Sequence, residues 1–578
     1  MYLMRVLRAL VLVVGIALAM PTHAVDAQDA LTAYESVRTW IDGWQIPDDA
    51  RVWIGEDAAG VCVTLRYEGV VVGRSVRMRA DDEALVEAIR EAMLESEYAL
   101  PVWRDATQRE QLMEIAPLVT LDIQIATEMT PVLGGTVEEA TREFSPGRHG
   151  VAARVGQDIA GVFGGTMLST NRLPSESLRS AMSELDLPLL PLAELRESHG
   201  VIVYRFDALH LAQSEASEPA QFLRRGGRHR TMRDVNTRGL REMGDGLAAH
   251  LLMRRDPSGG GALRGTYEPW THRYQNVEAD DLYAQALSAL ALARWSHVRR
   301  TQGLDSAGLM RVAVLVMEQL AARRQEVTSS ASASSMYVIA TRELSVDGVN
   351  LPPGVMALRA ECLAFLQTKY HKRRGFDGDV RVGERAMMCL ALAETPVGES
   401  AMERLLRDLG PTELTSAMPW LGWTTMVLAP ENGENESAVA LRAMRELVWR
   451  HQLEEVLLPV PDRDLAGGIV FTSSSNPLPT AQLVRPMAML ATMLGDRRLT
   501  SEEELTGELT SLMRSMRFLQ QLCAGESEGH MYVDPEAARW GVRSALWDQR
   551  MTLEHSAMGL LVVAETLDSV FRRTGSGR

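Results

Sequence analysis

The chain has 578 residues, of which 46% are hydrophobic, 24% charged and 5% aromatic, and its formal net charge is −16. This length exceeds the ~250–300 residues at which a single core stops growing, so at least two domains are expected. The acidic balance excludes sequence-independent binding to nucleic acid, which requires a basic surface. A net negative charge also keeps a protein soluble.

The first residues predict a secretory signal peptide over residues 1–27. MYLMRVLR is basic, ALVLVVGIALAM is apolar, and PTHAVDAQDA offers small residues for cleavage after Ala24 or Ala27. The apolar run is too short to span a membrane, and no later stretch reaches ~18 uninterrupted apolar residues. We therefore expect a secreted or periplasmic protein that is not stably inserted in a membrane after cleavage.

Strand and helix patterns are mixed in residues 29–220, which predicts an α+β domain. GVCVTLRYEGVVVGRSVRM indicates two strands joined by a turn at Glu68-Gly69. DDEALVEAIREAML has the apolar spacing and the acidic start of a helix. LVTLDIQIATEMTPV alternates as a half-buried strand does, and HGVIVYRFDALHL indicates another strand.

The same region resembles the AMMECR1 family domain. Five segments follow the order of that family's motifs: GVCVTLRYEG, LDIQIATEMTPVLGG, FSPGRHGVAARVG, LRSAMSELDLP and VIVYRFDALHL. The family's distinctive L-R-G-C-I-G motif falls on residues 71–76, where only Gly73 is retained. Because the arginine and the cysteine of that motif are absent, the resemblance implies the family's scaffold without an inherited site.

Residues 221–232 are predicted to link this region to a second domain. The segment FLRRGGRHRTMRD is basic and contains glycine. Such a segment is either a patch that binds an anion or a partner, or a solvated connection.

Residues 233–575 predict an all-α domain built as a six-hairpin ring, an (α/α)6 toroid. Amphipathic, charged outer helices are expected at 233–254, 305–325, 355–370, 400–409, 436–453 and 503–523. Inner helices, richer in small apolar residues, are expected at 284–296, 334–342, 386–394, 416–429, 484–494 and 555–567. Closing such hairpins into a ring removes the exposed end repeats that an open solenoid must cap.

This second region resembles the toroids of terpenoid cyclases and protein prenyltransferases. LAFLQTKYHKRRGFDGDVRVGERAMMCLALAE has their repeat, in which an outer helix leads through a glycine turn to an inner helix rich in Ala and Leu. MRFLQQLCAGESEGHMYVDPEAARWGVRSALWDQRMTLEHSAMGLLVVAE has the same plan with an insertion. Six-hairpin glycosidases, polysaccharide lyases and uronyl epimerases share this ring, so the resemblance implies an architecture and no single activity.

Several specific chemistries are not supported by the motifs. The run around Asp462 lacks the further acids of the cyclase protonation motif, and no cysteine has the aspartate spacing of the prenyltransferase zinc site. No GxSxG, HExxH, P-loop or GxGxxG motif stands in a suitable context. The cysteines Cys62, Cys362, Cys389 and Cys523 lie far apart in apolar stretches. An oxidising compartment permits disulfides, but buried free thiols are the commoner state in a domain with its own core. No metal or cofactor is expected.

The loops that precede the inner helices are expected to gather at one mouth of the ring. They are rich in aromatic and ionisable side chains, beginning with GTYEPWTHRY at residues 265–274. Aromatic faces beside carboxylates and arginines suit sugars. The candidate catalytic residues are Glu268, Asp280, Asp377, Asp462, Asp548 and His272. The candidate ligand-binding residues are Tyr267, Trp270, Arg273, Tyr274, Trp420, Trp423, Arg463, Trp540, Arg543 and Trp547.

Each of these residues also has a structural interpretation. Aromatic residues before inner helices pack, Asp280 can cap a helix, Asp377 can turn a loop, and single histidines such as His272 often hold hydrogen bonds in place. We therefore carry two main functional hypotheses. The first is a non-catalytic protein whose ring mouth binds a glycan or an envelope protein. The second is a carbohydrate-active hydrolase, lyase or epimerase, and an atypical isoprenoid cyclase is a third.

Overall fold

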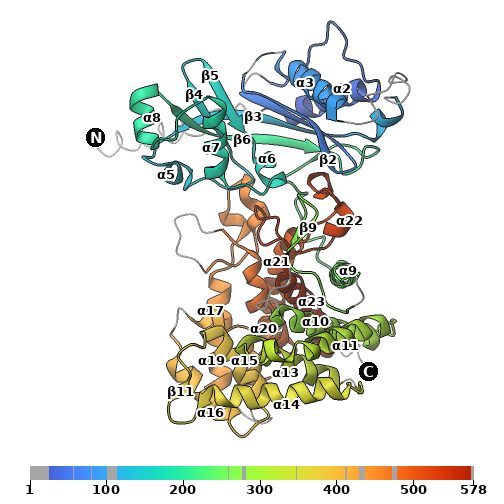
Figure 1. Cartoon of the computed structure of the whole chain (residues 1–578), viewed down its shortest axis with the longest axis vertical. Helices are drawn as coiled ribbons and strands as arrows, with labels where there is room; N and C mark the ends of the chain where they lie inside the picture. Colours follow the sequence, from blue (N-terminus) through green and yellow to red (C-terminus); the bar gives the residue numbers. More distant parts are fainter. Residues whose placement is uncertain are drawn as a thin grey trace, which may run out of the picture.

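The computed structural model describes residues 25–55, 58–79, 81, 83–99, 113–257, 260–275, 282–346, 348–410, 413–428, 436–471 and 478–574. An antiparallel sheet with helices lies at one end of the molecule, and a helical part lies below it (Figure 1). Residues 1–24 of the predicted signal peptide are outside the described ranges. None of the helices within those ranges combines the length and the apolar composition that crossing a membrane requires.

The sheet part is α+β, as the sequence predicts. Its described strands form one 7-stranded antiparallel sheet in the order β2-β1-β3-β6-β4-β5, with β7 beside β6. The strands are β1 (Gly60–Tyr67), β2 (Val70–Arg77), β3 (Thr120–Val132), β4 (Gly150–Val155), β5 (Asp158–Val162), β6 (Ile202–Ala212) and β7 (Gln221–Phe222). The helices are α2 (Ala27–Asp42), α3 (Ala84–Ala99), η2 (Ala116–Leu118), α5 (Val137–Thr141), α6 (Gly164–Ser169), α7 (Pro174–Glu184) and α8 (Leu192–His199). The predicted elements β1, β2, α3, β3 and β6 are confirmed.

The two faces of the central strands differ in chemistry, because side chains alternate along each strand. Val63 and Leu65 of β1 join the apolar core that α2 and α3 cover. The opposite face carries buried polar residues, among them Thr64, Asp122 and His210. This polar face is turned toward the helical part, as the contact described below between Asp122 and the helical part shows.

Gly73, the retained glycine of the AMMECR1-like motif, lies where β2 passes α3. A methyl group here would overlap the carbonyl oxygen of Ala92 and the hydroxyl of Ser96. Because the helix backbone cannot move aside freely, we expect Gly73→Ala to lower the free energy of unfolding by ~1–3 kcal/mol. Urea denaturation followed by circular dichroism tests this. Gly507→Ala is the control, since Gly507 lies in a helix with open space around it. Equal stability of the parent and Gly73→Ala would contradict the prediction.

Within the described residues, six inner helices contact one another in sequence order, and the last contacts the first, so the ring is closed. They are α10 (Leu282–Thr301), α13 (Ala331–Val346), α15 (Val382–Leu392), α18 (Trp420–Leu428), α20 (Val484–Gly495) and α23 (Leu553–Thr574). The outer helices are α9 (Thr237–Met253), α11 (Ala307–Ala322), α14 (Pro353–Thr368), α16 (Gly398–Asp408), α19 (Glu436–Arg450) and α21 (Glu502–Leu522). All twelve predicted helices are confirmed.

Short elements connect these helices. They are β8 (Tyr267–Glu268), β9 (Arg273–Tyr274), α12 (Arg324–Val327), β10 (Tyr370–His371), β11 (Gly375–Phe376), α17 (Leu414–Ala417), η5 (Glu455–Leu457), η6 (Val460–Leu465), η7 (Ala481–Leu483), η8 (Gly529–Met531) and α22 (Pro535–Ala538). Helix α10 is buried on most sides because it packs against α11, α13 and α23 at once. All four cysteines are buried and free, as predicted.

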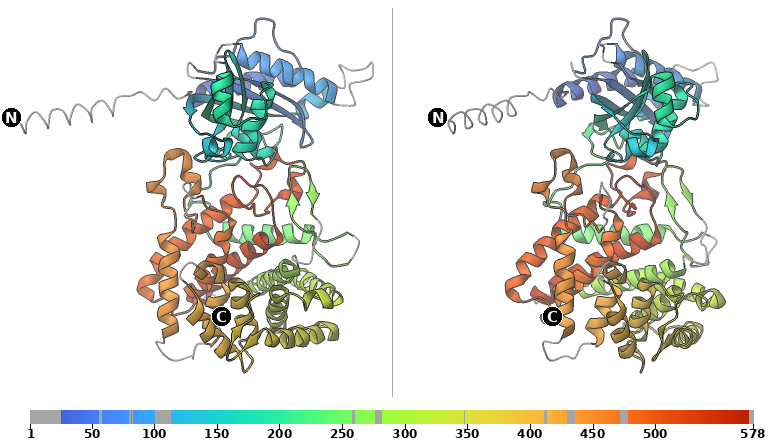
Figure 2. Two further views of the ribbon diagram at one scale, coloured as in Figure 1. Left: turned by 60° about the vertical axis from the view of Figure 1, so that its left-hand side comes forward. Right: turned by 90° about the vertical axis from the view of Figure 1, so that its left-hand side faces the viewer.

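The sheet part rests on the loops that precede three of the inner helices, α10, α20 and α23. Figure 2 shows the sheet directly above the helical part in both further views. Leu168 of α6 packs in one apolar cluster with Tyr267, Met531 and Tyr532 of the helical part. The backbone amide of Gln549 donates to a side-chain oxygen of Asn171 at 2.8 Å. The loops of the predicted mouth that precede α10, α20 and α23 are therefore covered by the sheet part, whereas the β10–β11 hairpin before α15 lies at the far end of the helical part (Figure 1).

A buried ion-pair network joins the two parts through the basic linker. Arg225 is only 4% exposed, and its guanidinium donates to both carboxylate oxygens of Asp464 and to Asp462 Oδ1 at 2.6 Å. Arg148 of the sheet part donates to Asp462 Oδ2 at 2.7 Å. Burial opposes ionisation of Asp462, but the charges of Arg225 and Arg148 outweigh it and lower the pKa of this carboxyl. At Arg225 the linker is therefore buried and held by ion pairs, so it is not a solvated connection at this residue.

Candidate functional site

The decapeptide at residues 265–274 forms a small hairpin of β8 and β9. Tyr267 is buried and stacks on Tyr274, with ring centroids 4.6 Å apart. Its hydroxyl lies 3.0 Å from His272 Nδ1, and the same nitrogen is 3.6 Å from Asp534 Oδ2. Burial raises the pKa of both tyrosines. These aromatic groups pack beneath the sheet part, so at this hairpin the structural interpretation describes what is observed.

The other predicted residues of this hairpin also make local contacts. Glu268 accepts hydrogen bonds from the Gln275 amide at 2.9 Å and the Thr271 hydroxyl at 3.3 Å. Arg273 is exposed and Trp270 is half-buried. Neither lines one of the three cavities described below.

The predicted aspartates are distributed among separate ion pairs. Asp377 lies 3.7 Å from Lys369 Nζ, beside the β10–β11 hairpin. Asp548 binds Arg550, whose Nε lies 2.9 Å away. Asp462 belongs to the network that joins the two parts, and its neighbour Arg463 is partly buried. Asp280 lies outside the described residues.

The remaining predicted residues pack inside the helical part. Trp420 is 1% exposed, and Trp540 lies against Gly246 of α9. Trp547 packs partly buried against the cluster that contains Tyr267. Arg543 is fully buried and donates from Nε to the carbonyl oxygen of Leu522 at 3.1 Å. The role of these residues as a site stays a prediction, because the structure brings none of the described candidate catalytic residues to those three cavities.

A cleft on the axis of the ring, here called the axial cleft, is lined by all six inner helices. Its inner cavity of about 240 Å³ and an outer cavity of about 490 Å³ have five lining residues in common. Those shared residues are Arg294, Arg342, Glu343, Val427 and Arg572. The lining comes from the middle and C-terminal turns of the inner helices, so the axial cleft lies toward the end of the ring remote from the sheet.

Charges of both signs alternate around the axial cleft. Arg294 reaches two carboxylates at once, with Nε 2.9 Å from Glu343 Oε1 and Nη1 3.5 Å from Glu565 Oε1. The side chains of Glu343 and Glu565 are 16% and 4% exposed. Burial lowers the pKa of Arg342, although the neighbouring carboxylates oppose that shift. The wall therefore offers hydrogen-bond donors and acceptors side by side.

Trp423 is the aromatic side chain of this wall. It is half-buried, meets Trp420 edge to face at 5.4 Å, and donates from its indole nitrogen to the Thr492 hydroxyl at 3.0 Å. That hydroxyl lies 3.1 Å from Glu565 Oε2. The hydrogen bond and the edge contact fix the plane of the indole at the cleft, and Trp423 is the one predicted ligand-binding residue that the described cavities include.

Sequence reasoning missed the charged residues of the axial cleft. It searched the loops before the inner helices, whereas Arg294, Glu343 and Glu565 lie within those helices. The available signal was a charged residue in the second half of a helix that is otherwise rich in buried apolar residues. Three inner helices carry such a residue, and this is consistent with a polar opening on the ring axis.

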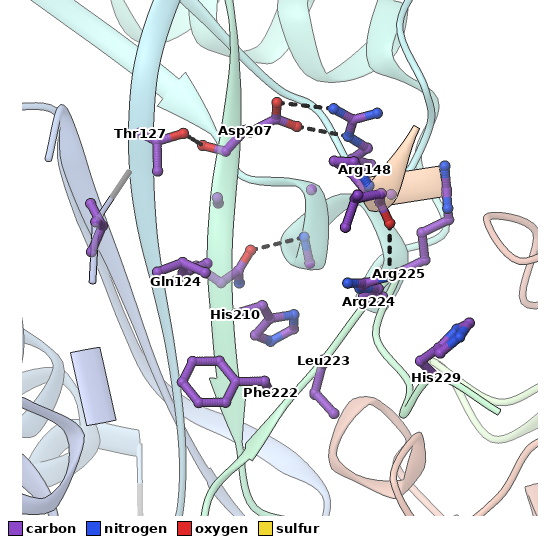
Figure 3. A pocket seen from close by; sticks show the side chains of 18 of the residues that line it. Gln124, Thr127, Arg148, Asp207, His210, Phe222, Leu223, Arg224, Arg225 and His229 are labelled. Carbon is purple, nitrogen blue, oxygen red and sulfur yellow. Dashed lines mark hydrogen bonds and ion pairs between the residues drawn. The ribbon is translucent and has the colours of Figure 1, made fainter. Parts of the chain in front are cut away.

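A third cavity, of about 660 Å³, lies between the sheet part, the linker and the loop that contains η6. Figure 3 shows Arg148, Arg224, Arg225 and His229 on one side of it. Arg148 is held by Asp207, with Nε 2.9 Å from Oδ1, and Arg224 donates to the carbonyl oxygen of Val460 at 2.9 Å. Four arginines and one carboxylate, Asp207, are the charged residues of its lining, and each of the four arginines already has a hydrogen-bond or ion-pair partner.

Next to this interdomain cavity lies a group of three buried residues with metal-ligating atoms. Asp122, His210 and His530 place one such atom each within 4.8 Å of one another, and His210 also lines the cavity. Burial lowers the pKa of His530 to about 3. The carboxyl of Asp122 is buried, but the neighbouring histidines and Arg66 outweigh burial and lower its pKa. Sequence spacing predicts no metal here, because the three residues are far apart in the chain.

Comparisons with known proteins give fold likenesses only. No known protein family and no curated protein matches the chain. An uncharacterised protein from Pyrococcus horikoshii matches with 18% identity and a TM-score of 0.26, covering 34% of this chain and 98% of its own. An inactive variant of an α-1,6-mannanase from Salegentibacter, solved with α-1,6-mannotetrose, matches with 11% identity and a TM-score of 0.38, covering 57% of this chain and 99% of its own. These TM-scores are too low to support a functional inference.

Proposed function

We propose that this protein acts outside the cytoplasm and binds a carbohydrate in the axial cleft of its ring. The extracytoplasmic location rests on the predicted signal peptide at residues 1–27. One observation supports a carbohydrate as the ligand: the exposed part of the Trp423 side chain lies beside alternating arginines and glutamates. A sugar ring has an apolar face that stacks on an indole and hydroxyls that both donate and accept hydrogen bonds.

The placement of the carboxylates favours binding over chemistry. Glu343 and Glu565 are contacted by the same guanidinium of Arg294. Two carboxylates bridged by one guanidinium can form hydrogen bonds with the hydroxyl groups of a bound sugar. Hydrolysis instead needs one carboxyl group that keeps a proton to donate. We therefore place carbohydrate binding first and glycoside hydrolysis second.

We expect Trp423→Ala to weaken glycan binding at least roughly tenfold, or ~1.4 kcal/mol, because the sugar loses its stacking surface. Affinity electrophoresis against neutral and uronate-rich polysaccharides, followed by calorimetry with the glycan that binds best, measures the change. Trp270→Ala is the matched control, since Trp270 is also half-buried but lies on the loop beneath the sheet. If Trp270→Ala loses binding and Trp423→Ala retains it, the binding site lies at the predicted mouth. If the parent protein binds no glycan, the proposal is rejected.

Glycoside hydrolysis remains a candidate because two carboxylates line one cleft. Their shared contact with Arg294 keeps them within ~10 Å, a range that includes the separations of glycosidase pairs. Release of reducing ends from the bound glycan, with binding retained but release abolished in Glu565→Gln, would establish it. Binding without any release identifies a binding protein.

A further inference from the structure

The polar face of the sheet meets the helical part at the three residues named above. Asp122 pairs with Ala212 across β3 and β6, and Gln124 pairs with His210, so Asp122 and His210 are diagonal neighbours on one face. His530 belongs to η8 in the helical part. The three residues are 4–8% exposed. They therefore bring two sheet ligands and one ring ligand together at a largely buried point beside the interdomain cavity.

The distances are close to those of a bound metal ion. His210 Nε2 lies 3.0 Å from Asp122 Oδ1, and His530 Nε2 lies 3.9 Å from Asp122 Oδ2. Ligand atoms that each lie ~2.0–2.2 Å from a tetrahedral Zn²⁺ are ~3.4 Å apart. Small side-chain adjustments would bring all three atoms to that spacing.

The hydrogen bonding of His530 favours a metal ligand over a simple structural histidine. Its Nδ1 is 2.9 Å from the carbonyl oxygen of Ser527, so Nδ1 carries the proton and donates it. Its Nε2 is then an acceptor with no hydrogen-bond partner, although it is buried and faces the carboxylate of Asp122. Two electron-rich atoms facing each other in a buried site call for a cation between them.

A second buried pair holds the His530 loop in place. Glu528 is 1% exposed and accepts from the Gly525 amide at 3.0 Å and from Arg543 at 3.3 Å. This gives Arg543, which the sequence suggested as a ligand contact, a positioning role for His530. Metal ligands are commonly supported by such outer contacts.

We propose that Asp122, His210 and His530 bind a divalent transition-metal ion at the junction of the sheet and the ring. Two imidazoles and one carboxylate are the donor set of Zn²⁺ and its first-row neighbours, and three protein ligands leave a position for water or an anion. Arg66 is also buried near Asp122, and its charge favours an anion in that position. Because the ligands come from both parts, the ion would fasten the sheet to the ring.

The test uses the full protein after EDTA treatment, with Zn²⁺ and Co²⁺ as probes. Equilibrium dialysis with elemental analysis should find one Zn²⁺ per chain, and His530→Gln should weaken binding at least ~100-fold. His199→Gln is the matched control, because His199 is exposed on α8 and should bind unchanged. Zn²⁺ should also raise the Tm of the parent and protect its linker from proteolysis, but do neither in His530→Gln.

Co²⁺ provides a readout that does not depend on a variant folding. The parent should develop the visible absorption bands of Co²⁺ bound to nitrogen and oxygen ligands, and an equivalent of Zn²⁺ should remove them. Less than one equivalent of tightly bound Zn²⁺ in the parent, or equal Zn²⁺ affinity in folded His530→Gln, would overturn the proposal. If His530→Gln does not fold, absence of the Co²⁺ bands in the parent overturns it and their presence supports it.

Discussion

Asp464→Asn is expected to lower the free energy of unfolding by ~3–5 kcal/mol, which is the usual cost of breaking a buried ion pair by removing one of its partners. Asp464 is 0% exposed and binds the guanidinium of Arg225, which is itself buried. The substitution keeps the shape of the side chain but leaves Arg225 with Asp462 alone. Because the network joins the linker to the ring, the sheet part should also separate from the ring at lower urea concentration.

Urea denaturation followed by tryptophan fluorescence, together with limited proteolysis of the linker, measures this effect. Asp408→Asn is the matched control, since Asp408 pairs with Arg404 on the ring surface and both side chains are 36% exposed. Such exposed pairs contribute less than ~1 kcal/mol. Adding Arg225→Met to Asp464→Asn should restore part of the stability, because the buried guanidinium that has lost one of its two carboxylate partners is then removed. The prediction fails if Asp464→Asn and Asp408→Asn unfold alike.

The second large effect that we expect is a loss of folding stability at acidic pH that arises from His250. This residue of α9 is 0% exposed, and burial, followed by the charge of Arg254, lowers its pKa to about 3. Between pH ~6.5 and ~3 the unfolded chain therefore binds a proton at His250 that the folded chain does not. The free energy of unfolding therefore falls by ~1.4 kcal/mol for each unit that the pH is lowered in this window. The effect ends once His250 is protonated in the folded form too.

The slope of stability against pH isolates this contribution from any change in packing. In EDTA-containing buffer between pH 6 and 4.5, His250→Gln should lose ~1.4 kcal/mol per pH unit less than the parent. His199→Gln again serves as the control, because an exposed histidine should leave the slope unchanged. Parallel slopes for the parent and His250→Gln would show that His250 is protonated alike in both states.

The helices of the ring could be predicted from the sequence because their signal is local. Small and apolar residues on all sides of segments such as 284–296 and 555–567 require burial in the middle of other helices, and α10 and α23 are found there. In the sheet part, the clear alternation of apolar and polar residues in β3 predicts a strand, whereas α5, α6 and the β4–β5 hairpin are short and were not predicted. Short elements carry too few residues for periodicity to distinguish them.

The sites were harder to predict because they depend on contacts between distant segments. Loops before the inner helices were expected to surround an opening, but no local pattern reveals that another part of the chain covers three of them. Asp462 and Arg543 look like site residues in the sequence, yet their partners Arg148 and Glu528 hold the structure together. His210 and His530 are unremarkable in their own segments and gain significance only when the sheet packs on the ring.

The packing inside the ring limits what the axial cleft can do with a long polymer. A ring open at both ends would let a chain thread through it, whereas here the packed first turns of the inner helices lie beyond the cleft floor. If the axial cleft binds a glycan as we propose, it would admit the end of that glycan or a short branch and would release it through the same opening. Free oligosaccharides and chain termini should thus compete better than the interior of a long polysaccharide.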